Sequence, residues 1–410
     1  MRFFWLIAAM LASAATQAAP LNLPAKPGYV GPTYWAKFPS TKAAGWSAPT
    51  FFPLGVWFQQ IHMQADVEAD KALGFNGYMQ VVGDANLALV RQNKMWLVND
   101  TPLRGQGPEL VGWLICDECD MTSGPGNARW DGVNASEHCI PKGTPCGYTQ
   151  VAHMKAKFPA DGRPFWLGNG KGVLFWETDE QAAKFNNEFA DFIGADTYAY
   201  TDNDFCVDNQ GGKLASTGLI AGTGKPVWTP YPTLQSVRAG NTIEECHRAS
   251  NYGALIERQR YFQSMARSYK PIWGYVETGH PVGKPNEPSI TGAQIEGAVM
   301  SNIIHGAAGI IYFTHDYVGK CLSQYGLRPG AGGCDVDKRK NVQRVNRIIK
   351  ELAPVINSPR LDWRFQVKEL DVRLSQGPDG AAYIFSQQNR GNAGTYTLSL
   401  PPDLAGAGQA

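Results

Sequence analysis

The sequence predicts a (β/α)8 barrel, a TIM barrel of the α/β class, followed by a short β-rich segment. Short apolar runs alternate with helical patterns eight times in one stretch, which indicates a parallel sheet covered by helices. About 390 residues follow the N-terminal leader, enough for one such barrel with insertions. An open doubly wound sheet is the alternative. It is less favoured because such folds usually have a Gly-rich phosphate turn after the first strand, and none follows the first predicted strand here.

Residues 1–19 have the pattern of a secretory signal peptide. Arg2 supplies a positive start, residues 3–11 are apolar, and small residues continue to Ala19. The apolar run is shorter than the ~20 residues that a membrane span needs, and no later segment is long and apolar enough. We therefore expect a secreted or periplasmic protein that is soluble and off the membrane once the leader is removed.

Composition argues against a nucleic-acid partner and leaves a carbohydrate partner open. The net charge is +1, charged residues make up 18% of the chain, and no basic run is present. Aromatic residues make up 11%, including twelve Trp. Such a content suits a large core, and it equally suits sugar binding, because an aromatic face packs on the apolar face of a sugar ring. No pattern calls for a cofactor.

The eight cysteines favour disulfides, because their number is even and the chain is expected to be exported. Cys321 and Cys334 bracket a Gly-rich loop and are expected to pair. Cys206 and Cys246 bracket another long loop.

The pairing of the other four cysteines stays open, and they also raise the alternative of a zinc site. Cys116 and Cys119 have a spacing that occurs in zinc sites. Cys139 and Cys146 are spaced too widely for a standard zinc ribbon, so disulfides are the preferred interpretation and no metal is expected.

The first half of the expected barrel, which as a whole spans residues 51–360, contains four apolar runs. Before it, residues 20–50 are rich in Pro, Gly, Ser and Lys and are expected to form an extended lead-in. The first helix has apolar residues among charges and stops at Gly74. The expected strands are 51–58, 75–82, 95–98 and 110–115, and the expected helices are 63–73 and 86–92.

The second half repeats the alternation of strand and helix. Thr291 is expected to cap one helix and Gly306 to end it. The expected strands are 165–167 with 172–176 as a candidate extension, 193–200, 271–276 and 309–314, and the expected helices are 148–158, 179–192, 249–269, 290–305 and 342–356.

Residues 361–410 are expected to form a small β-sandwich-like segment, either minimal or truncated. Turn residues at 377–380 and 390–394 separate short runs with strand character. The expected antiparallel strands are 365–370, 381–386 and 395–400.

Two glutamates follow expected strands at positions that suit catalysis. The active site of a (β/α)8 barrel lies at the carboxyl ends of its strands. Glu118 follows the fourth strand and Glu277 follows the seventh, so their side chains should face each other across the barrel mouth. Glycoside hydrolysis needs two carboxyl groups, and a retaining mechanism needs them ~5–5.5 Å apart.

Three short segments resemble clan A retaining glycosidases, which include β-galactosidase-like and cellulase-like barrels. They are Leu-Ile-Cys-Asp-Glu-Cys-Asp at 114–120, Pro-Ile-Trp-Gly-Tyr-Val-Glu at 271–277 and His-Gly-Ala-Ala-Gly-Ile-Ile-Tyr-Phe at 305–313. The resemblance implies that Glu118 is the acid/base and Glu277 the nucleophile of a secreted glycoside hydrolase.

The same resemblance implies a substrate-binding role for Asp117. In the clan an Asn more often stands there and holds the sugar 2-hydroxyl, and Cys119 stands where some members have Pro.

The two roles require different surroundings. The pKa of Glu118 must be raised by burial or by negative neighbours, such as Asp117, Asp120 or Glu277. Glu277 must be ionised and needs hydrogen-bond donors. We expect Tyr198 to be one donor, and we consider two histidines, His280 and His315, weaker candidates.

The remaining substrate-binding candidates are Asn99, Trp57 and Trp176. The two tryptophans could be sugar platforms, but core packing is the expected role for at least two of Trp57, Trp176 and Trp273, since each lies in or beside a strand. A carbohydrate-binding barrel without catalysis is the main alternative function, and a zinc-dependent hydrolase is a more remote one.

Overall fold

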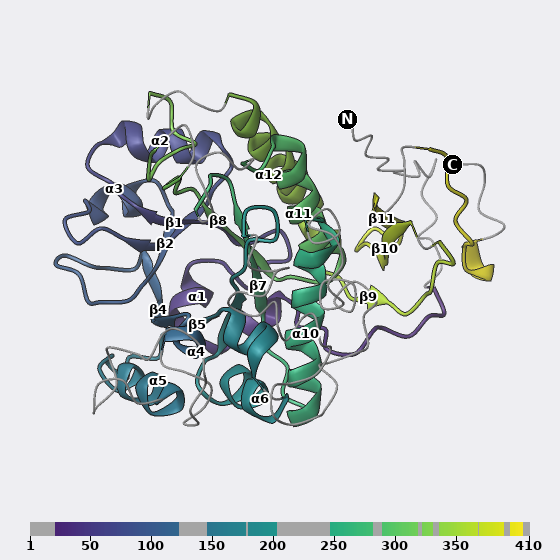
Figure 1. Ribbon diagram of the computed structural model, residues 1–410, viewed down its shortest axis with the longest axis horizontal. Helices are drawn as coiled ribbons and strands as arrows, with labels where there is room; N and C mark the ends of the chain where they lie inside the picture. The colour runs from purple at the N-terminus through teal and green to yellow at the C-terminus, as the bar shows by residue number, and fades with distance from the viewer. Residues whose placement is uncertain are drawn as a thin grey trace.

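The fold is a closed barrel of eight parallel strands with helices between them, as the sequence predicted (Figure 1). A computed structural model describes residues 21–122, 146–177, 179–202, 247–281, 289–318, 322–330, 336–367, 369–388 and 394–404. β1 pairs with both β2 and β8, which closes the barrel. The strands are β1 (Leu54–Gln59), β2 (Gly77–Val81), β3 (Trp96–Asn99), β4 (Leu110–Asp117), β5 (Phe165–Asn169), β6 (Phe192–Ala195), β7 (Ile272–Glu277) and β8 (Gly309–Phe313).

Helices follow the strands and cover the barrel from outside. The cap that we expected at Thr291 is present, because its side chain accepts a hydrogen bond from the Gln294 backbone at the start of α11. In the ranges described, no helix is long and apolar enough to span a bilayer. The helices are α2 (Gln64–Ala72), α3 (Leu87–Gln92), α4 (Cys119–Thr122), α5 (Gly147–Lys155), α6 (Asp179–Glu188), α10 (Ser250–Ala266), α11 (Gly292–Ile304) and α12 (Val336–Ile356).

The candidate extension of the fifth strand is wrong. Gly172–Trp176 forms a π-helix, η2, instead of a strand. The carboxylate of Asp120 accepts hydrogen bonds from the backbone N–H groups of Gly170 (3.0 Å) and Val173 (2.7 Å). These bonds satisfy backbone groups that a strand would offer to its neighbour, so the chain leaves the sheet directly after β5.

We had expected residues 20–50 to form an extended lead-in, but part of this segment is helical. It forms a 3-10 helix, η1 (Pro32–Lys37), and a short α-helix, α1 (Pro39–Ala43). These helices and the turn after them place two buried tryptophans, Trp35 and Trp46, against the barrel interior. Trp46 lies edge-on to Trp96 (5.1 Å between ring centroids) and tilted against Trp273 (5.6 Å). The lead-in therefore closes the end of the barrel opposite the strand carboxyl ends.

Tryptophans fill the barrel interior because glycines on neighbouring strands make room for them. A Cβ at Gly77 on β2 would overlap the indole ring of Trp96 on β3. A Cβ at Gly194 on β6 would come within 2.5 Å of Trp166 on β5. Trp273 is fully buried in the same interior, as expected for a core tryptophan.

The C-terminal segment forms one three-stranded antiparallel sheet. Its order is β11–β10–β9, with β9 at Arg360–Leu361, β10 at Leu370–Gln376 and β11 at Ala382–Gln388. The strand expected at 395–400 is absent, and the one expected at 365–370 begins only at its last residue. Figure 1 shows this sheet beside α11, outside the ring of barrel strands.

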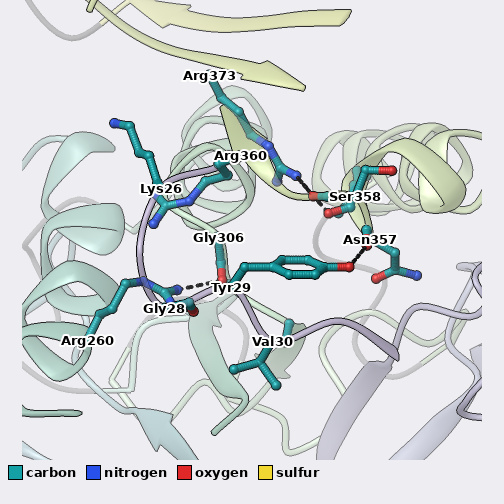
Figure 2. A pocket seen from close by; sticks show the side chains of 13 residues that line it. Lys26, Gly28, Tyr29, Val30, Arg260, Gly306, Asn357, Ser358, Arg360 and Arg373 are labelled. Atoms are coloured by element: carbon teal, nitrogen blue, oxygen red, sulfur yellow. Dashed lines mark hydrogen bonds between the residues drawn. The ribbon is translucent and has the colours of Figure 1, made fainter. Parts of the chain in front are cut away.

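Hydrogen bonds from Arg373 connect the sheet to the helices of the barrel (Figure 2). Arg373 on β10 is buried and donates to the carbonyls of Ile303 (2.9 Å), Ile356 (2.8 Å) and Ser358 (2.9 Å). Two of these carbonyls belong to the last turns of α11 and α12, where the helix dipole favours a cation. Burial, followed by the charge of Arg360, lowers the pKa of Arg373 to about 9.

Candidate active site

Polar residues gather where the barrel strands end. Asp117 is the last residue of β4, Glu118 follows it, and Glu277 is the last residue of β7. His315 comes two residues after β8. Since all eight strands are parallel and the sheet is closed, their carboxyl ends share one face of the barrel, which is where barrel active sites lie.

Glu277 is fully buried and is held by three hydrogen-bond donors. The hydroxyl of Tyr252 donates to Oε2 at 2.5 Å. The backbone N–H of Tyr200 (3.2 Å) and the hydroxyl of Thr201 (3.3 Å) donate to Oε1. Burial raises the pKa of Glu277 to about 7, and the donors act in the opposite direction. The donors therefore offset part of the cost of a buried charge at Glu277, and the carboxylate is favoured above about pH 7.

Our expectation that Tyr198 would donate to Glu277 is not met, because Tyr252 occupies that role. Tyr252 lies in the first turn of α10, the helix that leads from β6 to β7. Such a helix begins at the carboxyl end of the barrel, so its first turn is level with the site. That position was readable from the expected helix at 249–269, but which face of the helix turned inward was not.

Glu118 has the opposite surroundings. It is half-buried, its backbone is left-handed (φ 51°), and its carboxyl accepts no hydrogen bond from any residue described. Burial, then the negative charges of Asp196, Asp117 and Asp120, raise its pKa well above the usual range. Only Lys171 opposes them, and Lys171 is itself paired with Asp202. These surroundings favour the protonated form.

Asp196 was absent from our set of expected site residues, although it directly follows β6. It is buried, and it receives a hydrogen bond from Tyr198. Its Oδ1 has no hydrogen-bond partner in the described part of the chain. Its charge acts on Glu118, and the charge of Glu277 acts on it. Burial, then the charge of Asp117, raise the pKa of Asp196 itself well above the usual range, so Asp196 belongs to the same cluster of carboxyl groups as Glu118.

Asp117 and Asp120 complete a cluster of carboxyl groups. The Asp117 side chain is partly exposed to solvent. Desolvation by the surrounding protein atoms, followed by the negative charges of Asp120 and Asp100, raises its pKa to about 7. Burial raises the pKa of Asp120 to about 6, while its backbone hydrogen bonds lower it. The cluster therefore holds protons at pH values where isolated carboxyl groups are ionised.

The two histidines lie at the ends of β7 and β8. His280 is buried, and neither ring nitrogen has a hydrogen-bond partner among the described residues. The Nδ1 atom of His315 lies 2.6 Å from the hydroxyl of Tyr317, and burial lowers its pKa to about 4, so it is neutral at pH 7. Their roles in substrate binding stay predictions.

The other expected binding residues lie in different surroundings. Trp57 is inside the barrel, with its ring 5.7 Å from that of Tyr275. The side-chain amide of Asn99 is hydrogen-bonded to backbone groups. It accepts a hydrogen bond from the Val81 N–H on β2 (3.1 Å) and donates one to the Thr101 carbonyl (2.8 Å). The side chain of Trp176 falls outside the described part. Substrate contact by these residues stays a prediction.

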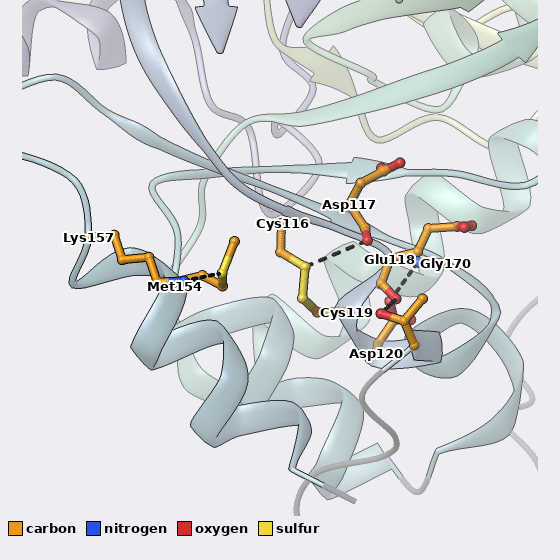
Figure 3. Close-up of a disulfide and its surroundings, with 9 residues drawn as sticks. Cys116, Asp117, Glu118, Cys119, Asp120, Met154, Lys157 and Gly170 are labelled. Carbon is orange, nitrogen blue, oxygen red and sulfur yellow. Dashed lines mark hydrogen bonds between the residues drawn. A yellow bond between two sulfur atoms is a disulfide. The ribbon is translucent and has the colours of Figure 1, made fainter. Parts of the chain in front are cut away.

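The sulfur atoms of Cys116 and Cys119 are joined in the structure, on either side of Asp117 and Glu118 (Figure 3). Their Cα atoms lie 5.8 Å apart. No group of three or more His, Cys, Asp or Glu side chains within the described ranges could hold a metal ion. Residues 1–19 lie outside the described ranges, as do Cys139, Cys206, Cys246, Cys321 and Cys334.

No protein-family model and no curated protein matches the chain. Solved structures similar to it include a glucosidase from Croceicoccus marinus, with a TM-score of 0.43 and 9% identity over 82% of this chain and 74% of that one. Gas2p of Saccharomyces cerevisiae in complex with laminaripentaose has a TM-score of 0.37 and 11% identity over 72% and 65%. A β-glucuronidase from Ruminococcus gnavus has a TM-score of 0.36 and 9% identity over 64% and 43%.

The chain thus spans less than two thirds of the length of the last two proteins. The activity of this chain has to be argued from its own residues, because the identities and scores are low.

Proposed function

We propose that this chain is a retaining glycoside hydrolase that cleaves a poly- or oligosaccharide, with Glu118 as acid/base and Glu277 as nucleophile. The observation that carries the proposal is the contrast between two carboxyl groups at one barrel mouth. Three donors surround Glu277, while like charges surround Glu118 and no donor from the described residues reaches it. Such opposed surroundings divide acid and base roles between two carboxyl groups.

In the first step, a carboxylate oxygen of Glu277 attacks the anomeric carbon and the glycosidic C–O bond breaks. Glu118 gives its proton to the departing oxygen, so the leaving group departs as an alcohol. In the second step, Glu118 takes a proton from water, the water oxygen attacks the anomeric carbon, and the bond to Glu277 breaks. Two inversions give net retention, and both carboxyl groups return to their starting states.

The cluster of carboxyl groups around Glu118 supports this cycle. Asp196 raises the pKa of Glu118, and Glu277 raises the pKa of Asp196, so these groups resist being ionised together. When Glu277 becomes an uncharged ester, one negative charge leaves the cluster. The proton on Glu118 is then held less tightly, which suits its second role as a base.

We also propose that the chain acts outside the cytoplasm. The order of charge, apolar run and small residues at 1–19 supports export. The adjacent sulfur atoms of Cys116 and Cys119 suit an oxidising compartment.

The test is a comparison of Glu277→Gln and Glu118→Ala with the wild type on β-linked galactans, glucans, mannans and arabinans. Wild type should release sugar from at least one polymer, with retained anomeric configuration in the first product seen by NMR. Both variants should be folded and lose activity by ~10³-fold or more. Glu351→Gln, an exposed carboxyl on α12, serves as the control and should keep full activity.

Added azide distinguishes the two roles on a 2,4-dinitrophenyl glycoside, whose leaving group departs without a proton from the acid. It should restore part of the activity of Glu118→Ala, because the glycosyl intermediate still forms and azide needs no base to attack it. Azide rescue confined to a Glu277→Ala variant, with inverted product, would reverse the assignment. Binding of glycans without any product from the wild type would instead identify a carbohydrate-binding protein.

A further inference from the structure

Cys116 and Cys119 enclose the acid/base candidate in a ring of four residues. Cys116 belongs to β4 and Cys119 begins α4, so the link joins a barrel strand to the first turn of the next helix. Cys119 is buried in the main hydrophobic core, and Cys116 packs against that core. Figure 3 shows the bonded sulfur atoms on one side of this turn and Glu118 on the other.

The backbone of Glu118 is left-handed, a conformation that residues other than glycine seldom adopt. Its N–H donates to the Gly168 carbonyl at 3.1 Å, and its carbonyl accepts from the N–H groups of Met121 and Thr122, both at 2.9 Å. A left-handed residue persists only where its surroundings impose it. The ring of Cys116 to Cys119 is a covalent restraint of that kind.

The Glu118 carboxyl depends on this backbone for its direction. No hydrogen bond to the carboxyl holds it among the described residues, in contrast to the three bonds at Glu277. A general acid has to stay within hydrogen-bond reach of the oxygen that it protonates. A turn that relaxes from the left-handed conformation would swing the carboxyl away, and nothing described would return it.

We propose that the Cys116–Cys119 disulfide is a positioning element for Glu118, which holds the strained turn so that the carboxyl stays directed at the leaving-group oxygen. This inference rests on the proposed glycosidase function. The two cysteines contact no reacting atom in this scheme. They act through the backbone of the residue between them.

The experiment compares a Cys116→Ala/Cys119→Ala double variant with the wild type on two aryl β-glycosides of one sugar, chosen from glucose, galactose, mannose and arabinose or their disaccharides. Dinitrophenolate departs without a proton, whereas phenolate needs one from the acid. The kcat/KM for the phenyl glycoside should fall at least about tenfold, and that for the 2,4-dinitrophenyl glycoside should stay within about twofold. The alkaline limb of the kcat/KM profile for the phenyl glycoside should also shift in the double variant relative to the wild type.

Val151→Ala is the matched control. Val151 is fully buried in the same core cluster as Cys119 but lies on α5, outside the ring. Its truncation lowers stability but leaves the Cys116–Cys119 link intact, so the ratio of the two kcat/KM values should stay at the wild-type value. An equal loss on both substrates in the folded double variant, or no loss on either, would overturn the inference.

If the double variant does not fold, reduction of the wild-type protein replaces it, with mass spectrometry of alkylated peptides to show which cysteines have opened. Opening of the Cys116–Cys119 link should selectively weaken phenyl glycoside cleavage, and reoxidation should restore it. Equal loss on both glycosides again refutes the positioning role. A wild type that cleaves neither these glycosides nor any polymer refutes the proposed function instead.

Discussion

At the residue scale, the contact between Tyr252 and Glu277 favours the ionised form of the proposed nucleophile. Burial alone disfavours a charge at Glu277, which is the largest influence on its pKa. A hydrogen bond to a charged group contributes about 1.5–3 kcal/mol, so the Tyr252 hydroxyl offsets a substantial part of this desolvation. The same contact gives the buried Tyr252 hydroxyl an acceptor for its proton, while its oxygen accepts a hydrogen bond from the Tyr200 backbone N–H (3.3 Å).

Replacement of Tyr252 by Phe should therefore raise the pKa of Glu277 further above its present value of about 7. The loss of a donor favours the protonated carboxyl, and a protonated nucleophile is inactive. The acid limb of the kcat/KM profile should move to higher pH, with activity at pH 6 lower by about tenfold for each unit of displacement. A pH profile of the Tyr252→Phe variant measures this.

Tyr261→Phe provides the control on the same helix. The Tyr261 hydroxyl donates to Asp179 at 3.3 Å, outside the site. The Tyr261→Phe substitution removes a comparable phenol–carboxylate contact away from Glu277, so the pH profile of this variant should match that of the wild type. An unchanged acid limb in Tyr252→Phe would contradict the role given to Tyr252.

At the element scale, the barrel is built by pairing small residues on one strand with indole rings on the next. The interior of such a barrel is a packed core rather than a pore. Gly77 on β2 lies against the face of Trp96, and this ring in turn contacts Trp46 from the lead-in. The space that Gly77 leaves free therefore lets Trp96 pack both in the barrel wall and against the lead-in that closes the end opposite the strand carboxyl ends.

The substitution Gly77→Ala should destabilise the protein by about 1–3 kcal/mol, the usual cost of overpacking, because the new methyl group meets a rigid ring. Urea unfolding of the variant measures the change. Gly83→Ala is the comparison, since a Cβ there meets no atom within 4 Å. Equal stability of the two variants would show that Trp96 moves aside freely and that the barrel is loosely packed.

At the scale of the whole molecule, the carboxyl cluster makes stability depend on pH in an uncommon direction. The pKa values of Asp117, Asp120 and Glu277 are raised to about 7, 6 and 7 from usual values near 4. A carboxyl whose pKa is raised on folding binds its proton more tightly in the native state. Its destabilising effect is absent below the unfolded pKa and develops as the pH rises to the folded pKa.

The melting temperature should therefore fall as the pH rises from about 4.5 to 7, the interval between the unfolded and folded pKa values. Glu118→Gln removes a carboxyl group that stays protonated in the folded protein but ionises in the unfolded chain as the pH rises, and this difference costs stability. The variant should melt at nearly the wild-type temperature at pH 4.5 and at a higher temperature at pH 7.5. Calorimetry across this interval tests the expectation, and a variant less stable than wild type at pH 7.5 would contradict it.

Much of this architecture was readable from local patterns. Hydrophobic periodicity and stop signals depend on near neighbours in the chain, so they located the eight strands within a few residues. Parallel strands in a closed sheet end on one face, so the strand count brought Glu118 and Glu277 to one mouth. The same reasoning failed at Gly172–Trp176, where backbone bonds to Asp120 override an apolar run.

The sequence by itself determined the barrel, its strand order and the two glutamates at the strand ends, because these follow from periodicity and from the rules of parallel sheets. Only the tertiary structure decided that Tyr252 holds Glu277, that Asp196 is buried and bonded to Tyr198, and that Cys116 joins Cys119. Each of these depends on how a side chain is turned in a packed, partly desolvated space. Spacing along the chain does not encode that orientation.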